Sequence, residues 1–206
     1  MTIYLHTHDL PDDLAFGSSV AIDTETMGLN LVRDRLCLIQ LSFGNGDAHL
    51  VRFPVGEGYD APNLKRLLTD PTIEKLFHFG RFDIASIRAY LGVQCTPVYC
   101  TKIASRLVRT FTDRHSLKEL CKELLGVELS KQQQSSDWGN STLTEEQQIY
   151  AANDVLYLHR LRAILDEMLV RENRKEIAQA CFDFLPARAE LDLMGWPDID
   201  LFAHNS

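Results

Sequence analysis

The sequence lacks the long apolar segment of a membrane-spanning helix. Its longest charge-free runs, residues 36–46 and 89–101, are shorter than the ~20 apolar residues that cross a bilayer. The first ten residues also lack a charged stretch followed by an apolar one, which is the plan of a signal peptide. We therefore expect a cytoplasmic protein with no membrane partner.

Cysteine is scarce and is not arranged in pairs. The number of cysteines is odd and no Cys-x-x-Cys spacing is present, which argues against a disulfide framework or a zinc site. Most of these residues lie inside apolar stretches, where a thiol behaves as a small buried hydrophobic group. We expect free thiols in a reducing compartment at Cys37, Cys95, Cys100, Cys121 and Cys181.

Positive charge is also in deficit, because 21 Lys and Arg residues face 29 Asp and Glu residues and the net charge is −8. Tight binding of long nucleic acid needs clustered basic residues that displace counterions, so a large basic face is not expected. Carboxylates gathered around divalent cations would themselves make a chain acidic. The positions of the acids therefore matter more than their number.

Residues 102–122 are the exception, with six basic residues against two acids. Lys102, Arg106 and Arg109 recur at helical spacing and so share one face. That face could bind a phosphate or line a subunit contact, but a solvated helix surface is the simpler interpretation.

Composition predicts one α/β domain over residues 1–206. With 45% apolar residues, a chain of this length can bury a core without disulfides or a structural metal. Neither internal repeats nor linkers rich in Gly, Ser or Pro divide it.

Short strands come first, and strands that alternate with helices follow. Residues 20–24, 36–43 and 48–53 are joined by turn-prone segments, which predicts an antiparallel meander. Residues 75–79 and 98–101 are short strands followed by helical patterns, which indicates a parallel extension of the same sheet. Helices are expected at residues 64–68 and 82–91. The predicted fold class is a mixed central β-sheet flanked by helices.

Two further helices are predicted near the end of the chain. Thr144 and Gln147 have the spacing of a capping box, so a helix begins there. A last helix is expected over residues 174–185, ending before Pro186 because proline breaks helix interiors. Apolar residues at helical spacing are Leu158, Leu161, Leu165 and Met168 in the first region and Ile177, Cys181 and Phe184 in the second.

Asp23 and Glu25 stand two residues apart at the edge of an apolar run. On a strand both side chains point to the same side of the sheet, where two carboxylates repel unless a cation lies between them. A pair of exposed acids at a strand end is the alternative, and one such pair is expected by chance in a chain of this composition.

Two more acidic motifs have the same setting. Asp83 begins a helix directly after an apolar strand, where an acid also complements the helix dipole without any further role. Tyr150 and Asp154 stand one helical turn apart and so project from one face; a buried tyrosine with a satisfied hydroxyl is the alternative.

Taken together, the motifs resemble those of the DEDDy 3′-to-5′ exonucleases in order and local context. Residues 136–138 (SDW) and 143–155 (LTEEQQIYAANDV) resemble the ribonuclease D branch. The segments DRHSLKEL, SKQQQSSDW and FLPARAELDLMGW, with the short length, resemble small stand-alone members that cleave dinucleotides. The resemblance implies an RNase H-like exonuclease fold and, for the small members, a homo-octamer.

The resemblance also implies a catalytic set with two divalent metal ions, Mg²⁺ or Mn²⁺, held by carboxylate oxygens. By this analogy Asp23 bridges the two ions, and Glu25 and Asp154 hold the ion beside the attacking water. Asp83 holds the second ion, partly through water. Tyr150 orients the attacking water or helps to deprotonate it, and orientation is favoured because a phenol with a reference pKa of ~10 is a poor base unless the metals lower that pKa.

Positions that contact substrate in relatives are implied at Leu29, His78, Lys131, Gln134 and Trp138. Leu29 matches an apolar side chain that wedges against the terminal bases, and a core leucine is the alternative. Lys131 matches a lysine near the scissile bond, and a solvated loop lysine is the alternative. For His78 the alternative is a buried core histidine whose ring nitrogens are hydrogen-bonded.

Two features depart from the family pattern. Many relatives carry His-Asn at the start of the second motif, whereas His78 is followed here by Phe79, so any contact made by that Asn is lost or replaced. Ribonuclease D also carries C-terminal helical nucleic-acid-binding domains, for which this length leaves no room. Both the length and the acidic balance favour very short RNA substrates.

We therefore expect a metal-dependent 3′-to-5′ exoribonuclease that hydrolyses short RNAs, chiefly 5′-phosphorylated dinucleotides, to mononucleotides. A broader exonuclease on longer RNA or DNA and a catalytically silent nucleic-acid-binding scaffold are the alternatives. Apolar residues near the end could pack on the core or bury a subunit interface: Leu191, Leu193, Met194, Trp196, Ile199, Leu201 and Phe202.

Overall fold

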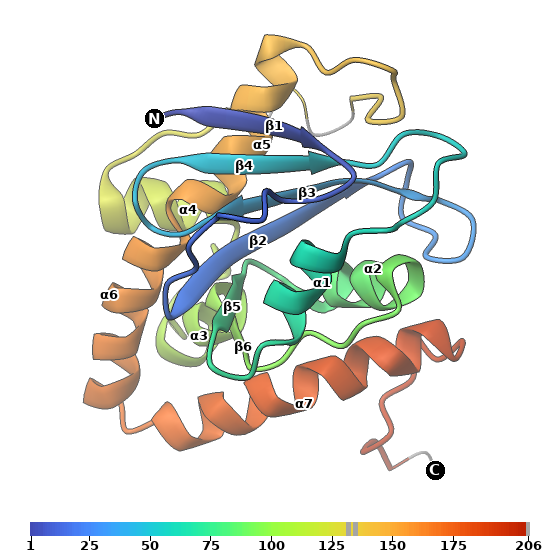
Figure 1. Cartoon of the computed structure of the whole chain (residues 1–206). Helices are drawn as coiled ribbons and strands as arrows, with labels where there is room; N and C mark the ends of the chain where they lie inside the picture. The colour runs from blue at the N-terminus through green and yellow to red at the C-terminus, as the bar shows by residue number, and fades with distance from the viewer. Residues whose placement is uncertain (131–132, 134–135, 205–206) are drawn as a thin grey trace.

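The fold is built on a mixed sheet of six strands in the computed structural model, which describes residues 1–130, 133 and 136–204 (Figure 1). The strands lie in the order β1-β4-β3-β2-β5-β6. β3 pairs antiparallel with β2 and β4, so the predicted meander is confirmed. The pairs β1–β4, β2–β5 and β5–β6 are parallel. The strands are β1 (Ile3–Thr7), β2 (Ser19–Thr26), β3 (Leu36–Ser42), β4 (Ala48–Arg52), β5 (Glu74–Phe77) and β6 (Val98–Cys100).

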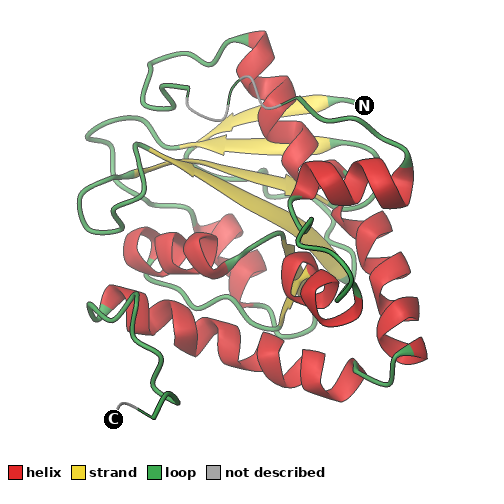
Figure 2. Cartoon of the chain, turned by 180° about the vertical axis from the view of Figure 1, so that it is seen from behind, coloured by secondary structure: helices red, strands yellow, loops and turns green. Residues whose placement is uncertain are grey.

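Helices flank this sheet, as predicted. α5 packs across β2, β3 and β4, and Figure 2 shows it crossing the strands when the molecule is seen from behind. α1 lies in front of the sheet in Figure 1, and α7 runs along the bottom, where it packs against α2 and β6. The helices are α1 (Pro62–Thr69), α2 (Arg81–Leu91), α3 (Thr101–Val108), α4 (Leu117–Leu120), α5 (Glu145–Leu156), α6 (Leu158–Arg171) and α7 (Lys175–Leu193), with a π-helical turn, η1 (Cys121–Leu125).

The core sits on both faces of the central strands. All seven residues of β3 are buried, which explains its nearly continuous apolar sequence. α5 begins where its capping box predicts, because the Thr144 hydroxyl accepts from the Gln147 amide and the Gln147 side chain accepts from the Thr144 amide. The cysteines are free thiols, and all but Cys181 are buried.

The structure corrects two strand predictions. β1 was not expected, because three of its five residues are exposed and it forms only by pairing with β4 at the sheet edge. The strand expected over residues 75–79 ends at Phe77, since Phe79 leaves the extended conformation with φ 63°.

The prediction that the last helix ends before Pro186 is also wrong. α7 continues to Leu193, and its second half is held against α2 by the Arg81–Asp192 and Arg88–Glu190 ion pairs, at 2.5 and 3.1 Å. These contacts between distant segments override the helix-breaking tendency of proline. The apolar residues at helical spacing do not form the buried face of α7, because Ile177 and Phe184 are exposed. The buried residues of α7 are Ala178, Phe182, Leu185, Pro186 and Ala189.

The apolar residues that follow α7 remain largely on the surface. Trp196, Ile199 and Leu201 are each about half exposed, and Phe202 is 82% exposed. Leu193 alone of the predicted set packs partly against the core. Among the described residues, no helix is long and apolar enough to span a membrane.

Candidate metal-dependent nuclease site

Three carboxylates meet at the C-terminal end of β2. Asp23 and Glu25 extend from the same side of β2, and Asp154 approaches from α5, which packs across that strand. One carboxylate oxygen from each residue lies within 4.8 Å of the other two. The structure thus brings together three acids that are up to 131 positions apart in the sequence.

Asp83 joins this group from the other side of the sheet. It lies buried in the first turn of α2, and its Oδ1 accepts a hydrogen bond of 2.6 Å from the Thr24 hydroxyl. Thr24 stands between the two acids of β2, and strand alternation turns it toward α2. Asp83 is close enough for its charge to raise the pKa of Asp23, Glu25 and Asp154.

Tyr150 lies one turn before Asp154 on α5 and hydrogen-bonds to that carboxylate. Burial, and then the charge of Asp154, raises the pKa of the Tyr150 phenol. Its hydroxyl is therefore protonated at neutral pH in the metal-free protein, where it donates to Asp154. The Trp138 ring packs beside it, with 6.1 Å between ring centroids.

Gln40 and Thr24 complete the site and were not predicted from the sequence. Gln40 is fully buried on β3 directly opposite Asp23, and its side-chain amide donates to Asp23 Oδ2 at 3.3 Å. A lone amide inside the apolar strand LCLIQLS is a signal that could have identified Gln40. Thr24 gives no such signal, because a threonine is ordinary on a strand.

Burial, and then repulsion between neighbouring acids, opposes ionisation of the carboxylates. Burial and then the neighbouring acids raise the pKa values of Asp23 and Glu25 well above their usual range. Burial likewise raises the pKa of Asp83 to about 6 and that of Asp154 to about 7. Such a cluster binds either protons or cations. Oxygen-only ligands with this much negative charge suit Mg²⁺ or Mn²⁺, so the donor set fits the predicted metals.

The predicted substrate residues separate into three groups. Leu29 is 86% exposed, which excludes the alternative of a core leucine. Trp138 is only 3% exposed in a small core cluster, so the structure corrects it from a substrate contact to a packing residue behind Tyr150. Lys131 and Gln134 lie outside the described residues.

His78 is held in a neutral state beside the site. Its Nδ1 lies 2.9 Å from the Thr101 hydroxyl, and the imidazole also hydrogen-bonds to the backbone of His115. Burial, and then the charge of Lys102, lowers the pKa of His78 to about 3. A neutral imidazole with two hydrogen bonds positions its neighbours and does not gain or release a proton near neutral pH.

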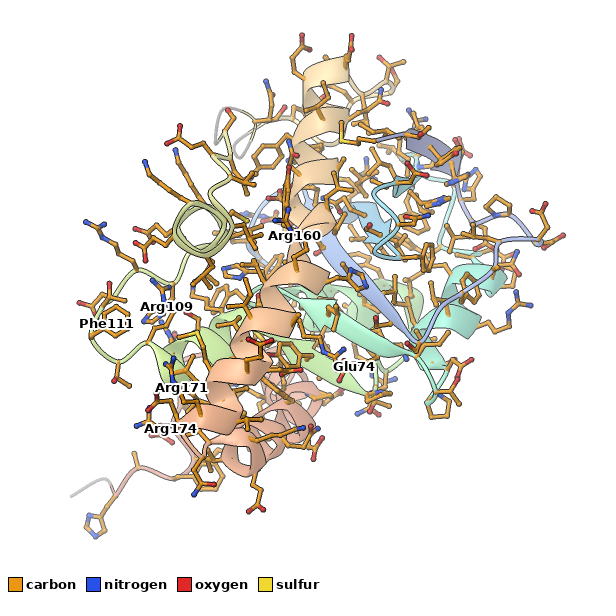
Figure 3. The ribbon with its side chains drawn as sticks, turned by 90° about the vertical axis from the view of Figure 1, so that its left-hand side faces the viewer. Glu74, Arg109, Phe111, Arg160, Arg171 and Arg174 are labelled. Atoms are coloured by element: carbon orange, nitrogen blue, oxygen red, sulfur yellow. The ribbon has the colours of Figure 1, made fainter. Side chains whose placement is uncertain are left out.

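The basic stretch is not a uniform solvated face. Arg106 is exposed, but Arg109 is 1% exposed and donates to Glu123 and to the Arg114 carbonyl, so the simple interpretation was wrong for Arg109. Lys102 lies over the Phe79 ring. Figure 3 shows Arg109 on the same side of the molecule as Phe111, Arg160, Arg171 and Arg174.

A family model described as a 3′-5′ exonuclease matches residues 6–170. The chain therefore belongs to the family of 3′-5′ exonucleases, which are hydrolases of phosphodiester bonds. Ribonuclease D of Bartonella henselae is 31% identical over 177 residues, which cover 84% of this chain and 43% of the relative. Ribonuclease D of Gluconacetobacter diazotrophicus is 34% identical over 155 residues, covering 75% and 39%. The chain thus spans less than half the length of these relatives.

Within that family the chain is similar to the nano-RNase C type. The structure of Brucella melitensis NrnC has a TM-score of 0.95 and 56% identity, with 100% of both chains covered. A structure described as NrnC bound to pGG has a TM-score of 0.95 and 55% identity, again over 100% of both chains. Escherichia coli RNase D has a TM-score of 0.74 and 28% identity over 84% of this chain and 45% of that chain. The predicted exonuclease fold and ribonuclease D-like branch are confirmed.

Proposed function

We propose that the protein is a metal-dependent 3′-to-5′ exoribonuclease that hydrolyses short RNAs, chiefly 5′-phosphorylated dinucleotides, to mononucleotides. The observation that carries this proposal is the meeting of Asp23, Glu25 and Asp154 at the end of β2, with Asp83 beside them and Tyr150 on Asp154. The similarity to a protein whose structure is described as bound to pGG supports the dinucleotide as substrate.

Two divalent cations, Mg²⁺ or Mn²⁺, would be held by the four carboxylates, with Asp23 shared between them. When bound, such cations activate water and neutralise charge that develops at phosphorus and on the leaving oxygen. Gln40 holds the Asp23 carboxylate in place by donating to its Oδ2. Thr24 does the same for Asp83.

Tyr150 would position the attacking water. Its protonated hydroxyl is already tied to Asp154 and so lies beside the carboxylates that hold the cation. With that proton committed to Asp154, the phenol oxygen would accept a hydrogen bond from the water and restrict its orientation, which lowers the entropy lost at the transition state.

We extend the proposal to the setting of the enzyme. Residues 1–206 would work as a single exonuclease domain in the cytoplasm, where the five free thiols stay reduced. Assembly as a homo-octamer is proposed from the similarity to the nano-RNase C type, and the exposed apolar residues after α7 offer a surface for subunit contacts.

A broader exonuclease on longer RNA or DNA is the second candidate, and the match to ribonuclease D over 84% of the chain favours it. A silent scaffold is disfavoured, because a scaffold has no need for buried acids whose mutual repulsion destabilises the fold.

The test is a time course with Mn²⁺ on 5′-labelled RNAs of two to seven nucleotides and a DNA dinucleotide, all at equal concentration, with Asp23→Asn as control. Fast loss of the RNA dinucleotide and slow attack on longer chains would support the proposal. Equal or rising rates with length would transfer the assignment to the broader exonuclease. If no substrate is cleaved in a Mn²⁺-dependent reaction, the silent scaffold would be the remaining candidate.

A further inference from the structure

Phe79 has a backbone conformation that is unusual for an aromatic residue. Its φ of 63° places it in the left-handed region, where side chains other than glycine and asparagine are uncommon. It lies directly between the end of β5 and α2, the helix whose first turn carries Asp83. Strained residues of this kind concentrate at functional sites.

The neighbours of Phe79 restrict the turn in which it lies. Gly80 caps α2 and packs so closely that a Cβ built on it would lie 2.4 Å from the Cβ of Phe77. On the other side, the His78 imidazole is fixed by Thr101 and by the backbone of His115. The turn between β5 and α2 is therefore rigid, and the direction of the Phe79 side chain is set by it.

The ring of Phe79 is exposed and held from one side. Its side chain is 49% exposed, and the Lys102 ammonium lies 3.8 Å from the ring centroid, over one face. A cation at this distance attracts the ring quadrupole and restricts the ring. The exposed part of the ring is then a flat apolar surface whose orientation is restricted before any ligand binds.

This surface lies at the same edge of the sheet as the acids. β2 and β5 are neighbouring parallel strands, so the chain leaves both at one edge (Figure 1). Glu25 stands near the end of β2 and Phe79 two residues beyond the end of β5. Leu29, which follows β2, is exposed at this edge as well.

We propose that Phe79 is a stacking platform on which one nucleobase of the substrate lies, with Lys102 holding the ring from the opposite face. The inference rests on the proposed function and adds a binding determinant at the position where many relatives carry asparagine. Stacking accepts every base because each has a π-face, so Phe79 would supply affinity with little sequence preference. Purines would gain more than pyrimidines because their larger rings overlap more of the platform.

The test combines a variant with a missing base. Phe79→Asn removes the ring and keeps a residue that adopts the left-handed region readily. We expect KM for an intact 5′-phosphorylated dinucleotide to rise between about 5-fold and about 150-fold, the range for loss of one stacked base, with kcat much less affected. For the wild-type protein, removing the base from one of the two nucleotides of the substrate should raise KM to the same extent. At that position Phe79→Asn should show no additional loss, and Phe79→Trp should restore the wild-type KM.

Phe16→Asn is the matched control. Arg66 lies over the Phe16 ring at 5.9 Å, but Phe16 precedes β2 and so lies at the opposite end of that strand from the acids. Its KM should equal that of the wild type. A melting curve and a Mn²⁺ titration of each variant report folding and metal binding independently of substrate.

A spectroscopic measurement reports stacking without turnover. In a Tyr150→Phe background, a dinucleotide that contains 2-aminopurine should lose fluorescence on binding, because stacking quenches this base, and Phe79→Asn should abolish the quenching. An unchanged KM in folded Phe79→Asn, or a missing-base penalty that persists in this variant, would overturn the inference. The proposed function fails by a different result, the absence of Mn²⁺-dependent hydrolysis by the wild-type protein.

Discussion

At the scale of single residues, Tyr150 separates catalysis from metal binding. Its phenol touches Asp154 but contributes no formal charge to the cluster, since its pKa is raised by burial. We expect Tyr150→Phe to lower kcat by at least about 100-fold through loss of the positioned water, with the Mn²⁺ affinity lowered by no more than about tenfold because Asp154 loses one hydrogen bond. Single-turnover rates and calorimetric Mn²⁺ titrations would measure the two quantities.

Tyr157→Phe is the control for Tyr150→Phe. Tyr157 follows α5 directly and takes no part in the acidic cluster. It should keep the wild-type rate. A Tyr150→Phe variant that turns over normally, or one that loses Mn²⁺ binding, would contradict the positioning role.

Thr24 acts through Asp83. Its hydroxyl donates to Asp83 Oδ1 and so lowers the pKa of that carboxyl against the larger effect of burial. Thr24→Val should raise the Asp83 pKa further and weaken Mn²⁺ binding about tenfold, as expected for losing a hydrogen bond to a charged group. Thr24→Ser keeps the hydroxyl and should restore affinity. If Val and Ser variants bind Mn²⁺ equally, the hydrogen bond has no such role.

The sequence predicted the five residues that the structure brings together but not their supports. Asp23, Glu25, Asp83, Tyr150 and Asp154 could be predicted because the order and local context of their motifs resemble a known family, although each motif alone has an ordinary structural explanation. The contacts of Thr24 with Asp83 and of Gln40 with Asp23 span 59 and 17 positions. Such contacts depend on how α2 and β3 pack, which no local pattern records.

At the scale of elements, α5 determines where Tyr150 and Asp154 lie. Its N-terminus is fixed by the reciprocal hydrogen bonds of Thr144 and Gln147. Thr144→Ala should destabilise the protein by about 1 kcal/mol and lower Tm by about 2–4 °C. Thr142→Ala, at an exposed position outside the cap, is the matched control and should change Tm little. Equal melting temperatures in calorimetry would show that the cap does not stabilise α5.

Local signals predicted some element boundaries and failed at others. The start of α5 was predictable because a capping box lies within four residues. The end of α7 was not, because Arg81 and Arg88 on α2 stabilise the turns beyond Pro186 from about 100 positions away. β1 escaped prediction for the same reason, since its partner β4 lies more than 40 residues later.

At the scale of the whole molecule, part of the excess of acidic residues is concentrated at one place in the fold. Four of the 29 acidic residues are gathered at one edge of the sheet, where their repulsion opposes folding unless protons or cations are bound. The metal-free and metal-loaded proteins should therefore differ in how their stability depends on pH.

The sign of that dependence follows from the raised pKa values. Asp83 and Asp154 titrate near 6 and 7 in the folded chain but near 4 when unfolded, so the folded state holds their protons more tightly. Their contribution to stability is fully present below pH ~4 and is lost as pH rises through about 7. Below pH ~6.5 the buried imidazoles act in the opposite direction, because burial lowers the pKa of His78 and His49.

The informative window is therefore pH 6.5 to 8, where the carboxyls lose their last protons and the imidazoles are already neutral. With a chelator present, Tm should fall by several degrees across this window, and saturating Mn²⁺ should raise Tm most at pH 8 because cations replace the lost protons. Asp154→Asn should flatten the metal-free profile, whereas Asp13→Asn, at an exposed position, should leave it unchanged. A metal-free Tm that is constant or rises from pH 6.5 to 8 would mean that the pKa values of Asp83 and Asp154 are not raised in the folded protein.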